Sequence, residues 1–172
     1  KFPNIIFILQ TWNKQECKNK NSWREITENN TIIDKLTVEN YFEDINLTDN
    51  CLILDESDIK LLGHKRGRIC KSLCPTRGWK NMWYGIYKGL ENIYTNNVSR
   101  LVIFRYDYFD LPQSVTNQSE IIDFIYNNLN NQNITFLKRK NTIGVDNCYI
   151  GPFYKIKSLI EKFHFHLDDI LY

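Results

Sequence analysis

The stretch Arg100-Leu101-Val102-Ile103-Phe104-Arg105-Tyr106-Asp107 sets four apolar residues directly before a cation and a carboxylate. Short apolar runs rich in β-branched and aromatic residues are typical of strands that are buried on both faces. Asn4–Leu9 and Cys51–Leu54 are runs of the same kind, and polar residues also follow each of them. The sequence therefore predicts three buried strands with polar side chains at their carboxyl ends.

Helical periodicity separates these strands. Gly78–Tyr94 carries Met82, Ile86 and Leu90 at a spacing of four, which predicts one apolar helix face. A second helix is predicted at Ser119–Leu129, with Ser119 as the N-cap. Its expected apolar face consists of Ile121, Ile122, Ile125 and Leu129.

Weaker signals complete the order of elements. Thr31–Val38 is compatible with a strand or a helix, and Asn133–Leu137 and Asn147–Ile150 are expected to be strands. A closing helix is predicted at Pro152–Phe163, with the proline in its first turn. Strands that alternate with helices predict an α/β fold with a mostly parallel sheet flanked by helices. Ligands of such sheets bind beyond the carboxyl ends of the strands.

The chain has 172 residues and is 42% hydrophobic, which fits a single domain over residues 1–172 with a sizeable core. It contains no run of about 20 apolar residues, so no membrane span is expected. The five cysteines form no CxxC pair, and no zinc set is apparent. We expect them to be reduced thiols in a reducing compartment, and hence a cytoplasmic location.

Charge is segregated along the chain. Residues 59–90 contain eight Lys or Arg residues and no Asp or Glu, although the whole chain carries only a small net charge of +2. Such a basic segment attracts phosphate groups. Trp79, Trp83 and Tyr84 lie among these charges and would also suit single-stranded nucleic acid. The alternative interpretation is a solvated segment with no ligand.

Carboxylates at predicted strand ends are the main candidates for chemistry. Asp107, with Asp110 three residues later, could hold a hard divalent cation against a diphosphate. Arg105 would point to the same side as Asp107 and contact a phosphate, or it could form a structural ion pair with that carboxylate. Asp146 precedes a predicted strand, but its Gly-Val-Asp-Asn context is also that of an ordinary turn.

Other motifs carry less weight. His164 and His166 alternate near the end of the sequence and are more typical of surface groups than of metal ligands. The glycines fit neither the GxGxxG pattern of dinucleotide-binding proteins nor the P-loop pattern. The GxSxG motif of serine hydrolases is also absent from the sequence.

Taken in order, four segments resemble small GT-A-fold nucleotide-sugar glycosyltransferases, in particular those encoded by large DNA viruses such as chlorella viruses and giant amoebal viruses. The segments are the strand at the start with Gln10-Thr11-Trp12, the helix from Gly78, the strand that leads into Arg105-Tyr106-Asp107, and Gly144–Gly151 before the last helix. The resemblance spans nearly the whole chain. Arg-x-Asp stands here where Asp-x-Asp is the commoner pattern.

The resemblance implies roles for individual residues. Gln10, Thr11 and Trp12 would contact the nucleoside of the donor, and Asp55 and Glu56 would contact its base or ribose. Phosphate contacts would come from the basic residues Arg77, Lys80 and Arg105. Asp107 and Asp110 would match the acidic motif that holds Mn²⁺ or Mg²⁺. Asp146 would match the acidic residue that faces the acceptor and acts as a general base in inverting members.

The resulting hypothesis is a metal-dependent glycosyltransferase. It would move a sugar from a nucleoside-diphosphate donor, of UDP type, to a glycan or glycoprotein acceptor. Two alternatives stay open at this point. One is a phosphate- or nucleic-acid-binding module that uses residues 60–88, and the other is a non-catalytic domain of the same fold.

Overall fold

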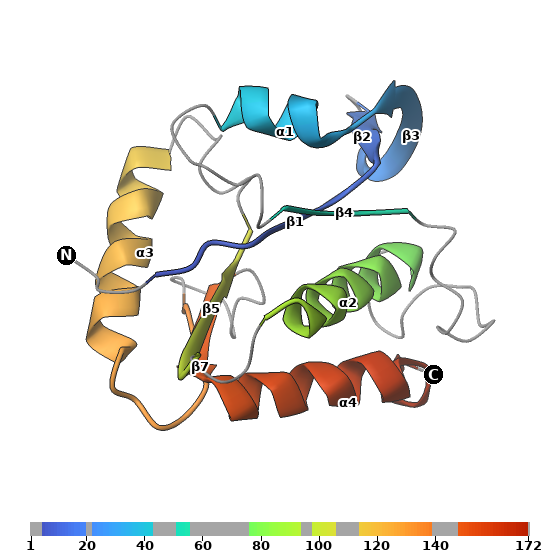
Figure 1. The fold of residues 1–172 in the computed structure, drawn as a ribbon. Coiled ribbons are helices and arrows are strands. Elements are labelled where there is room, and N and C mark those ends of the chain that lie inside the picture. Colours follow the sequence, from blue (N-terminus) through green and yellow to red (C-terminus); the bar gives the residue numbers. More distant parts are fainter. Residues whose placement is uncertain are drawn as a thin grey trace. The chain divides into compact units, whose positions relative to one another are not determined.

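A computed structural model describes residues 5–19, 22–42, 51–55, 76–93, 98–105, 114–138 and 148–171. Figure 1 shows the elements in these ranges. The strands are β1 (Leu9–Trp12), β2 (Lys14–Asn19), β3 (Ser22–Ile32), β4 (Cys51–Leu54), β5 (Arg100–Phe104), β6 (Thr135–Phe136) and β7 (Cys148–Pro152). The helices are α1 (Lys35–Tyr41), α2 (Thr76–Glu91), α3 (Ser114–Asn128) and α4 (Phe153–Leu171).

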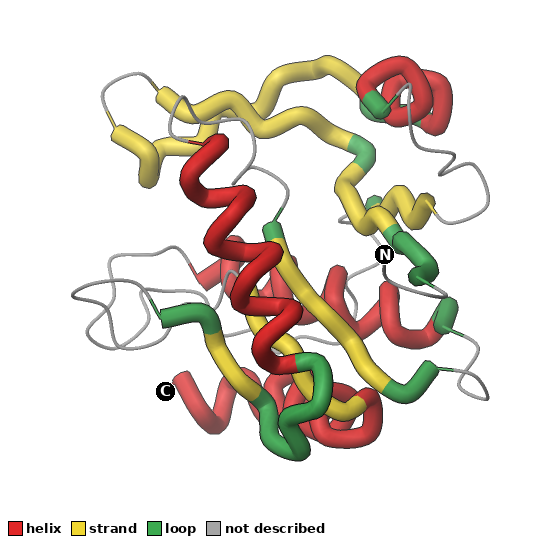
Figure 2. The backbone as a smooth tube through the Cα atoms, turned by 90° about the vertical axis from the view of Figure 1, so that its left-hand side faces the viewer, coloured by secondary structure: helices red, strands yellow, loops and turns green. Residues whose placement is uncertain are grey.

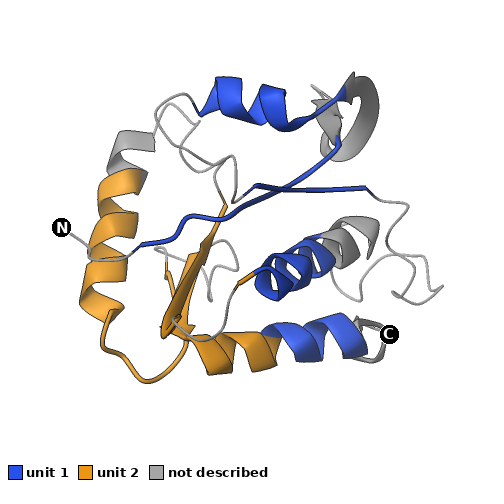
Figure 3. Ribbon diagram, in the orientation of Figure 1, with its two compact units in different colours: residues 1–92, 160–172 blue, residues 93–159 orange. Residues whose placement is uncertain are grey.

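The chain divides into two compact units, which are coloured separately in Figure 3. The first comprises residues 1–92 and 160–172, and the second comprises residues 93–159. The mixture of helices and strands confirms the predicted α/β class. No helix within the described ranges is long and apolar enough to span a membrane.

In the first unit, β1 and β4 form a parallel pair in which Leu9 lies opposite Cys51 and Trp12 lies opposite Leu54. The predicted strand Cys51–Leu54 is therefore confirmed. The expected strand Asn4–Leu9 is wrong over Ile5–Ile8, where the chain is not a strand and three large apolar side chains are at least half exposed. β4 begins opposite Leu9, so the described residues provide no partner for the preceding segment.

The next elements form an antiparallel hairpin of β2 and β3 with two irregularities in its register. The helix α1 follows β3 after two intervening residues, and Asp34 caps it by accepting hydrogen bonds from the Thr37 backbone N–H at 2.8 Å and from its hydroxyl at 2.7 Å. The predicted strand or helix at Thr31–Val38 is in fact the end of a strand followed by the start of a helix.

Helix α2 confirms the helix expected at Gly78–Tyr94, although it begins at Thr76 and ends at Glu91. Among the side chains of α2 that the structure describes, Trp83, Tyr84 and Leu90 are buried. Trp83 stacks on Phe163 of α4, with ring centroids 4.2 Å apart and planes 6° apart. The aromatic residues of α2 therefore supply much of the described core of the first unit.

In the second unit, β7 lies between β5 and β6 and is antiparallel to both. The expectation of a mostly parallel sheet is thus wrong for the described strands, among which only β1 and β4 are paired in parallel. β5 and β6, which α3 separates in the sequence, do run in the same direction. β7 is inserted between them, as in a split βαβ unit.

The second unit has its core where α3 packs on this sheet (Figure 2). The buried residues Ile121, Leu137 and Cys148 form a cluster with Phe124 and Ile125. α3 begins at Ser114, so the predicted N-cap at Ser119 is wrong. The intervening residues include neither glycine nor proline, and the helix therefore continues through them. Ile122, expected on the apolar face, is 52% exposed.

β7 and α4 meet without a loop. Pro152 is the last residue of the strand, and the helix begins at Phe153, whose N–H donates to the carbonyl of Ser99 at 2.9 Å. The helix continues beyond the predicted end at Phe163, with a break in helical geometry at His166. Residues 153–159 belong to the second unit and the remainder to the first.

Candidate functional site

The carboxyl ends of β1 and β4 carry a linked pair of polar residues, Asn13 and Asp55. The Asn13 side-chain amide donates to Asp55 Oδ2 at 2.7 Å. The Asn13 backbone N–H donates to the carbonyl of Leu54 at 2.8 Å, and its carbonyl accepts from Ile33 at 2.8 Å. This end of the parallel pair is the place where α/β sheets bind ligands, so it is the first candidate site.

Gln10, Thr11 and Trp12 belong to β1 itself, so the expectation that they follow the strand is wrong. They are half-buried, and the Gln10 amide donates to the Thr11 carbonyl at 3.1 Å. Trp12 stacks on Tyr84 of α2, with ring centroids 6.4 Å apart. The structure thus brings four of the predicted nucleoside contacts, Gln10, Thr11, Trp12 and Asp55, to one pair of strands.

Helix α2 approaches β1 closely at Gly85. A Cβ atom at this glycine would lie 2.7 Å from Gln10 Cδ and 2.9 Å from its Nε2. The absence of a side chain at position 85 therefore lets the Gln10 amide lie against the helix. Arg77 and Lys80 belong to the first turns of the same helix, and their side chains lie outside the described part of the structure.

A second candidate site lies at one edge of the sheet of β5, β7 and β6. Phe104 pairs with Cys148, and these residues are the last of β5 and the first of β7. The chain therefore leaves β5 and enters β7 at the same edge. Arg105, directly after β5, is exposed.

Four predicted site residues, Glu56, Asp107, Asp110 and Asp146, lie outside the described residues. In sequence, Asp107 comes three residues after Phe104 and Asp146 comes two residues before Cys148. Both carboxylates are thus close in sequence to the same ladder pair. Within the described ranges, no group of three His, Cys, Asp or Glu side chains could hold a metal ion.

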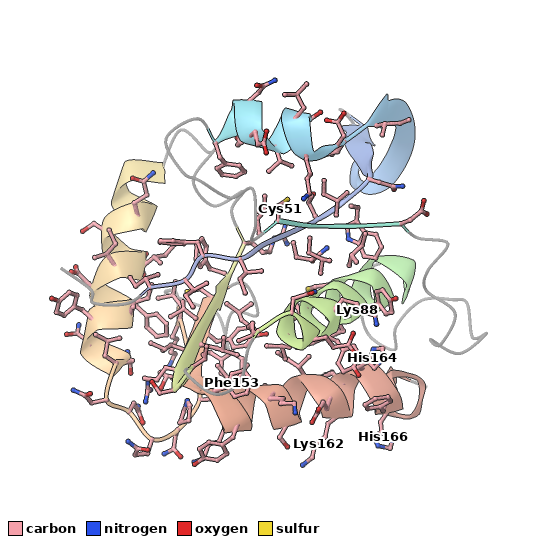
Figure 4. The ribbon with its side chains drawn as sticks, viewed as in Figure 1. Cys51, Lys88, Phe153, Lys162, His164 and His166 are labelled. Atoms are coloured by element: carbon pink, nitrogen blue, oxygen red, sulfur yellow. The ribbon has the colours of Figure 1, made fainter. Side chains whose placement is uncertain are left out.

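His164 is the main surprise among the titratable residues, because the expectation of a surface group is wrong for it. It is 3% exposed and stacks on Tyr87 of α2, with ring centroids 4.1 Å apart and planes 2° apart. Its Nδ1 has no hydrogen-bond partner among the described residues. Burial, together with the nearby charge of Lys88, lowers the pKa of His164. Lys88 and His164 are labelled in Figure 4.

The groups that surround His164 on α2 form their own pair. Lys88 Nζ lies 2.6 Å from Glu91 Oε2, and this hydrogen bond lowers the pKa of Glu91. The hydrogen bond between Glu91 and Tyr87 raises the pKa of the tyrosine. These contacts account for the packing of His164 against α2. None of them indicates that His164 binds a ligand.

Sequence reasoning missed two residues that shape the first candidate site, Asn13 and Gly85. The only sequence feature that could have identified Asn13 as a site residue is its position directly after the polar end of β1. Gly85 interrupts the apolar spacing of a helix, and such a glycine often has a packing reason. Comparison of the chain with protein-family models, with curated proteins and with solved structures finds no match.

Proposed function

We propose that the chain is a metal-dependent glycosyltransferase that moves a sugar from a nucleoside-diphosphate sugar, of UDP type, to a glycan or glycoprotein acceptor. The observation that carries the proposal is the ladder pair Phe104 and Cys148. The segments with Asp107 and Asp146 adjoin this pair in sequence, one after β5 and the other before β7. Two carboxylates that adjoin one ladder pair in sequence suit a reaction that needs both a charge-stabilising group and a base.

The chemistry assigns each acid a different task. In glycosyl transfer, the acceptor oxygen forms a bond to the anomeric carbon while the bond from that carbon to the diphosphate breaks. Asp146 would take the proton of the acceptor hydroxyl as a general base. Asp107 and Asp110 would hold Mn²⁺ or Mg²⁺, and a cation bound there neutralises charge on the departing diphosphate.

The donor nucleoside is assigned to the carboxyl end of β1 and β4. The half-buried Trp12, whose ring stacks on Tyr84, would offer an aromatic surface to a base, and Gln10 and Thr11 would contribute polar groups from the same strand. Asp55 would contact the nucleoside, as would Glu56. The cationic residues Arg77, Lys80 and Arg105 would contact the phosphates.

A thermal-shift panel of nucleotide sugars, with and without Mn²⁺, tests the proposal. A ligand at 100 times its dissociation constant stabilises the folded protein by about 2.7 kcal/mol. We expect one UDP-sugar to raise the midpoint only when Mn²⁺ is present. Stabilisation by a single-stranded oligonucleotide, and by no nucleotide sugar, would instead favour a nucleic-acid-binding module that uses residues 60–88.

Two variants separate the proposed roles of the acids. Asp107→Asn should abolish the Mn²⁺-dependent shift. Asp146→Ala should retain that shift and lower sugar transfer by about 10²- to 10⁴-fold, the usual contribution of a general base. Asp123→Asn, at an exposed position of α3, is the matched control and should change neither measurement. Donor binding without any transfer by the wild-type protein would indicate a non-catalytic domain.

A further inference from the structure

His164 lies in an aromatic site between α4 and α2, within the first unit. Its imidazole stacks on the ring of Tyr87, with centroids 4.1 Å apart and planes 2° apart, and its centroid is 5.9 Å from that of Tyr84. The ring of Phe165 meets the imidazole edge-on at 4.8 Å. Because the histidine is only 3% exposed, these rings occupy the space that water fills around a surface histidine. Such a site suits a neutral imidazole.

The charges around this site determine which protonation state of His164 fits it. Lys88 Nζ lies 5.8 Å from the ring centroids of both Tyr84 and Tyr87, so a cation already lies close to these two rings (Figure 4 labels Lys88 and His164). Glu91 favours a charged imidazole, but its carboxylate already accepts hydrogen bonds from Lys88 and Tyr87. In the part of the chain that the structure describes, Nδ1 of His164 has no hydrogen-bond partner. Protonation of His164 would therefore add a buried cation beside Lys88.

Two effects compete when the imidazole gains a proton. The face of the Tyr87 ring attracts a cation. Burial of a charge that lacks a hydrogen-bonded partner costs more than one cation–π contact returns. Burial and the charge of Lys88 accordingly lower the pKa of His164, and the attraction of Glu91 offsets only part of this effect. Protonation should therefore drive the imidazole out of the aromatic site.

Tyr84 connects this site to the end of β1. Its ring lies near His164 on one element and stacks on Trp12 on another, with centroids 6.4 Å apart and planes 29° apart. Tyr84 is 4% exposed, and Trp12 is half-buried. Because protein interiors are close-packed, the displacement of one side chain is transmitted to its neighbours. Departure of His164 thus removes one of the contacts that hold Tyr84 against Trp12.

We infer that His164 is a positioning residue, which in its neutral form holds Tyr84 against Trp12, so that protonation of this histidine weakens the binding of the donor nucleotide. The inference rests on the proposed function and adds a pH dependence to donor binding. His164 itself does not contact the donor. It acts through the packing of α4 on α2.

Nuclear magnetic resonance at a series of pH values tests the connection in the wild-type protein without any ligand. The imidazole protons of His164 give its half-protonation pH, which should lie below the ordinary value of 6.5. The indole N–H signal of Trp12, assigned with Trp12→Phe, should shift with the same midpoint. In His164→Phe, which keeps a ring but cannot be protonated, this shift should disappear. His166→Phe, at an exposed position of the same helix, is the matched control and should keep the shift.

Tyr84→Leu tests whether the tyrosine transmits the effect. Leucine keeps an apolar side chain at this buried position but has no aromatic ring. His164 should still titrate in this variant, and the Trp12 signal should no longer follow it. A Trp12 signal that still follows His164 would show that the connection does not pass through Tyr84 and would refute the inference.

Calorimetric titration with UDP and Mn²⁺ at the same pH values tests the consequence for donor binding. The terminal phosphate of UDP itself titrates at about pH 6, so the Kd of the wild-type protein is divided by that of His164→Phe at each pH. This ratio should be close to one well above the half-protonation pH of His164. It should rise about twofold at that pH and about tenfold one pH unit below it, because only the neutral fraction binds the donor.

The outcomes separate the inference from the proposed function. Absence of UDP binding at every pH would overturn the proposed function and the pH-dependent donor binding inferred from it, whereas the Trp12 signal would still report whether His164 holds Tyr84 in place. If UDP binds and the ratio does not change with pH, the proposed function stands and the inference is refuted. A Trp12 signal in the wild-type protein that ignores the titration of His164 would refute the inference as well.

Discussion

Replacement of Gly85 by alanine tests the packing of α2 against β1. A Cβ atom at position 85 would lie 2.7 Å from Gln10 Cδ and 2.9 Å from its Nε2, whereas real Cβ atoms essentially never come within 3.0 Å of a heavy atom of a residue that is not their neighbour in the chain. The Gln10 amide must therefore move. It would then lose its 3.1 Å hydrogen bond to the Thr11 carbonyl.

Two opposing free energies determine the result. Alanine is more favourable than glycine in a helix interior by about 1 kcal/mol. Against this, the lost hydrogen bond costs about 1 kcal/mol and a distorted Gln10 rotamer costs about 0.5–1.5 kcal/mol. We expect Gly85→Ala to lower the free energy of unfolding by about 0.5–1.5 kcal/mol in the wild-type background.

The Gln10→Ala background removes the side chain that Cβ would meet. There Gly85→Ala should raise the free energy of unfolding by about 1 kcal/mol, so the two substitutions should be coupled by about 1.5–2.5 kcal/mol. Urea denaturation of the four proteins, followed by circular dichroism, measures the cycle. Gly89→Ala is the control, because a Cβ there meets nothing within 4 Å and should stabilise both backgrounds. Additive effects of the substitutions at positions 10 and 85 would refute the described packing.

Three further predictions concern stability. Burial lowers the pKa of His164 from its ordinary value of 6.5, so this residue gains its proton in the unfolded chain before it does so in the folded protein as the pH falls. The free energy of unfolding should therefore decrease below about pH 6.5, by at most about 1.4 kcal/mol per pH unit. His164→Phe should remove this part of the pH dependence, which urea titrations at several pH values would measure. Ile156→Ala, at a fully buried position of α4, should lower the free energy of unfolding in urea by about 2–5 kcal/mol. The control Lys162→Ala, at an exposed position of the same helix, should lower it by less than about 0.5 kcal/mol, and equal effects of the two substitutions would contradict the described burial. Arg100→Lys should lower the free energy of unfolding by about 1 kcal/mol in the same assay, because Arg100 Nη2 donates to the backbone carbonyls of Asn128 and Asn131. An unchanged free energy of unfolding would show that these two hydrogen bonds do not stabilise the fold.

Apolar content and periodicity were sufficient to predict several elements. β4 and β5 are confirmed at their predicted bounds, because each is a short run of apolar residues without a competing signal. α2 is confirmed with shifted ends. The hairpin of β2 and β3 was missed, since its residues are mainly polar and charged and it has no apolar alternation. Its strands are paired by backbone hydrogen bonds that any sequence can make.

Strand pairing was the less predictable part of the fold. The alternation of strands and helices indicated parallel neighbours, and β5 and β6 do run in the same direction. Nothing in the composition of β7 showed that it would lie between them. Pairing depends on contacts between residues far apart in sequence, which local propensity does not encode.

The candidate site was predictable only in part. The residues directly after apolar runs were predicted to be site residues, and the structure brings Gln10, Thr11, Trp12 and Asp55 to one pair of strands. The hydrogen bond between Asn13 and Asp55 joins residues 42 positions apart in sequence, and Gly85 matters through a side chain on another element. Such long-range relations require the fold itself.

The central position of β7 has a consequence for biosynthesis. β5 and β6 both emerge from the ribosome before the strand that joins them, and their described sheet pairings are with β7 alone. Until residues 148–152 have emerged as well, the nascent chain must hold these two strands without the partner that pairs them. Unpaired strand edges promote aggregation during synthesis, so chaperone demand should peak in this interval and fall once β7 is added.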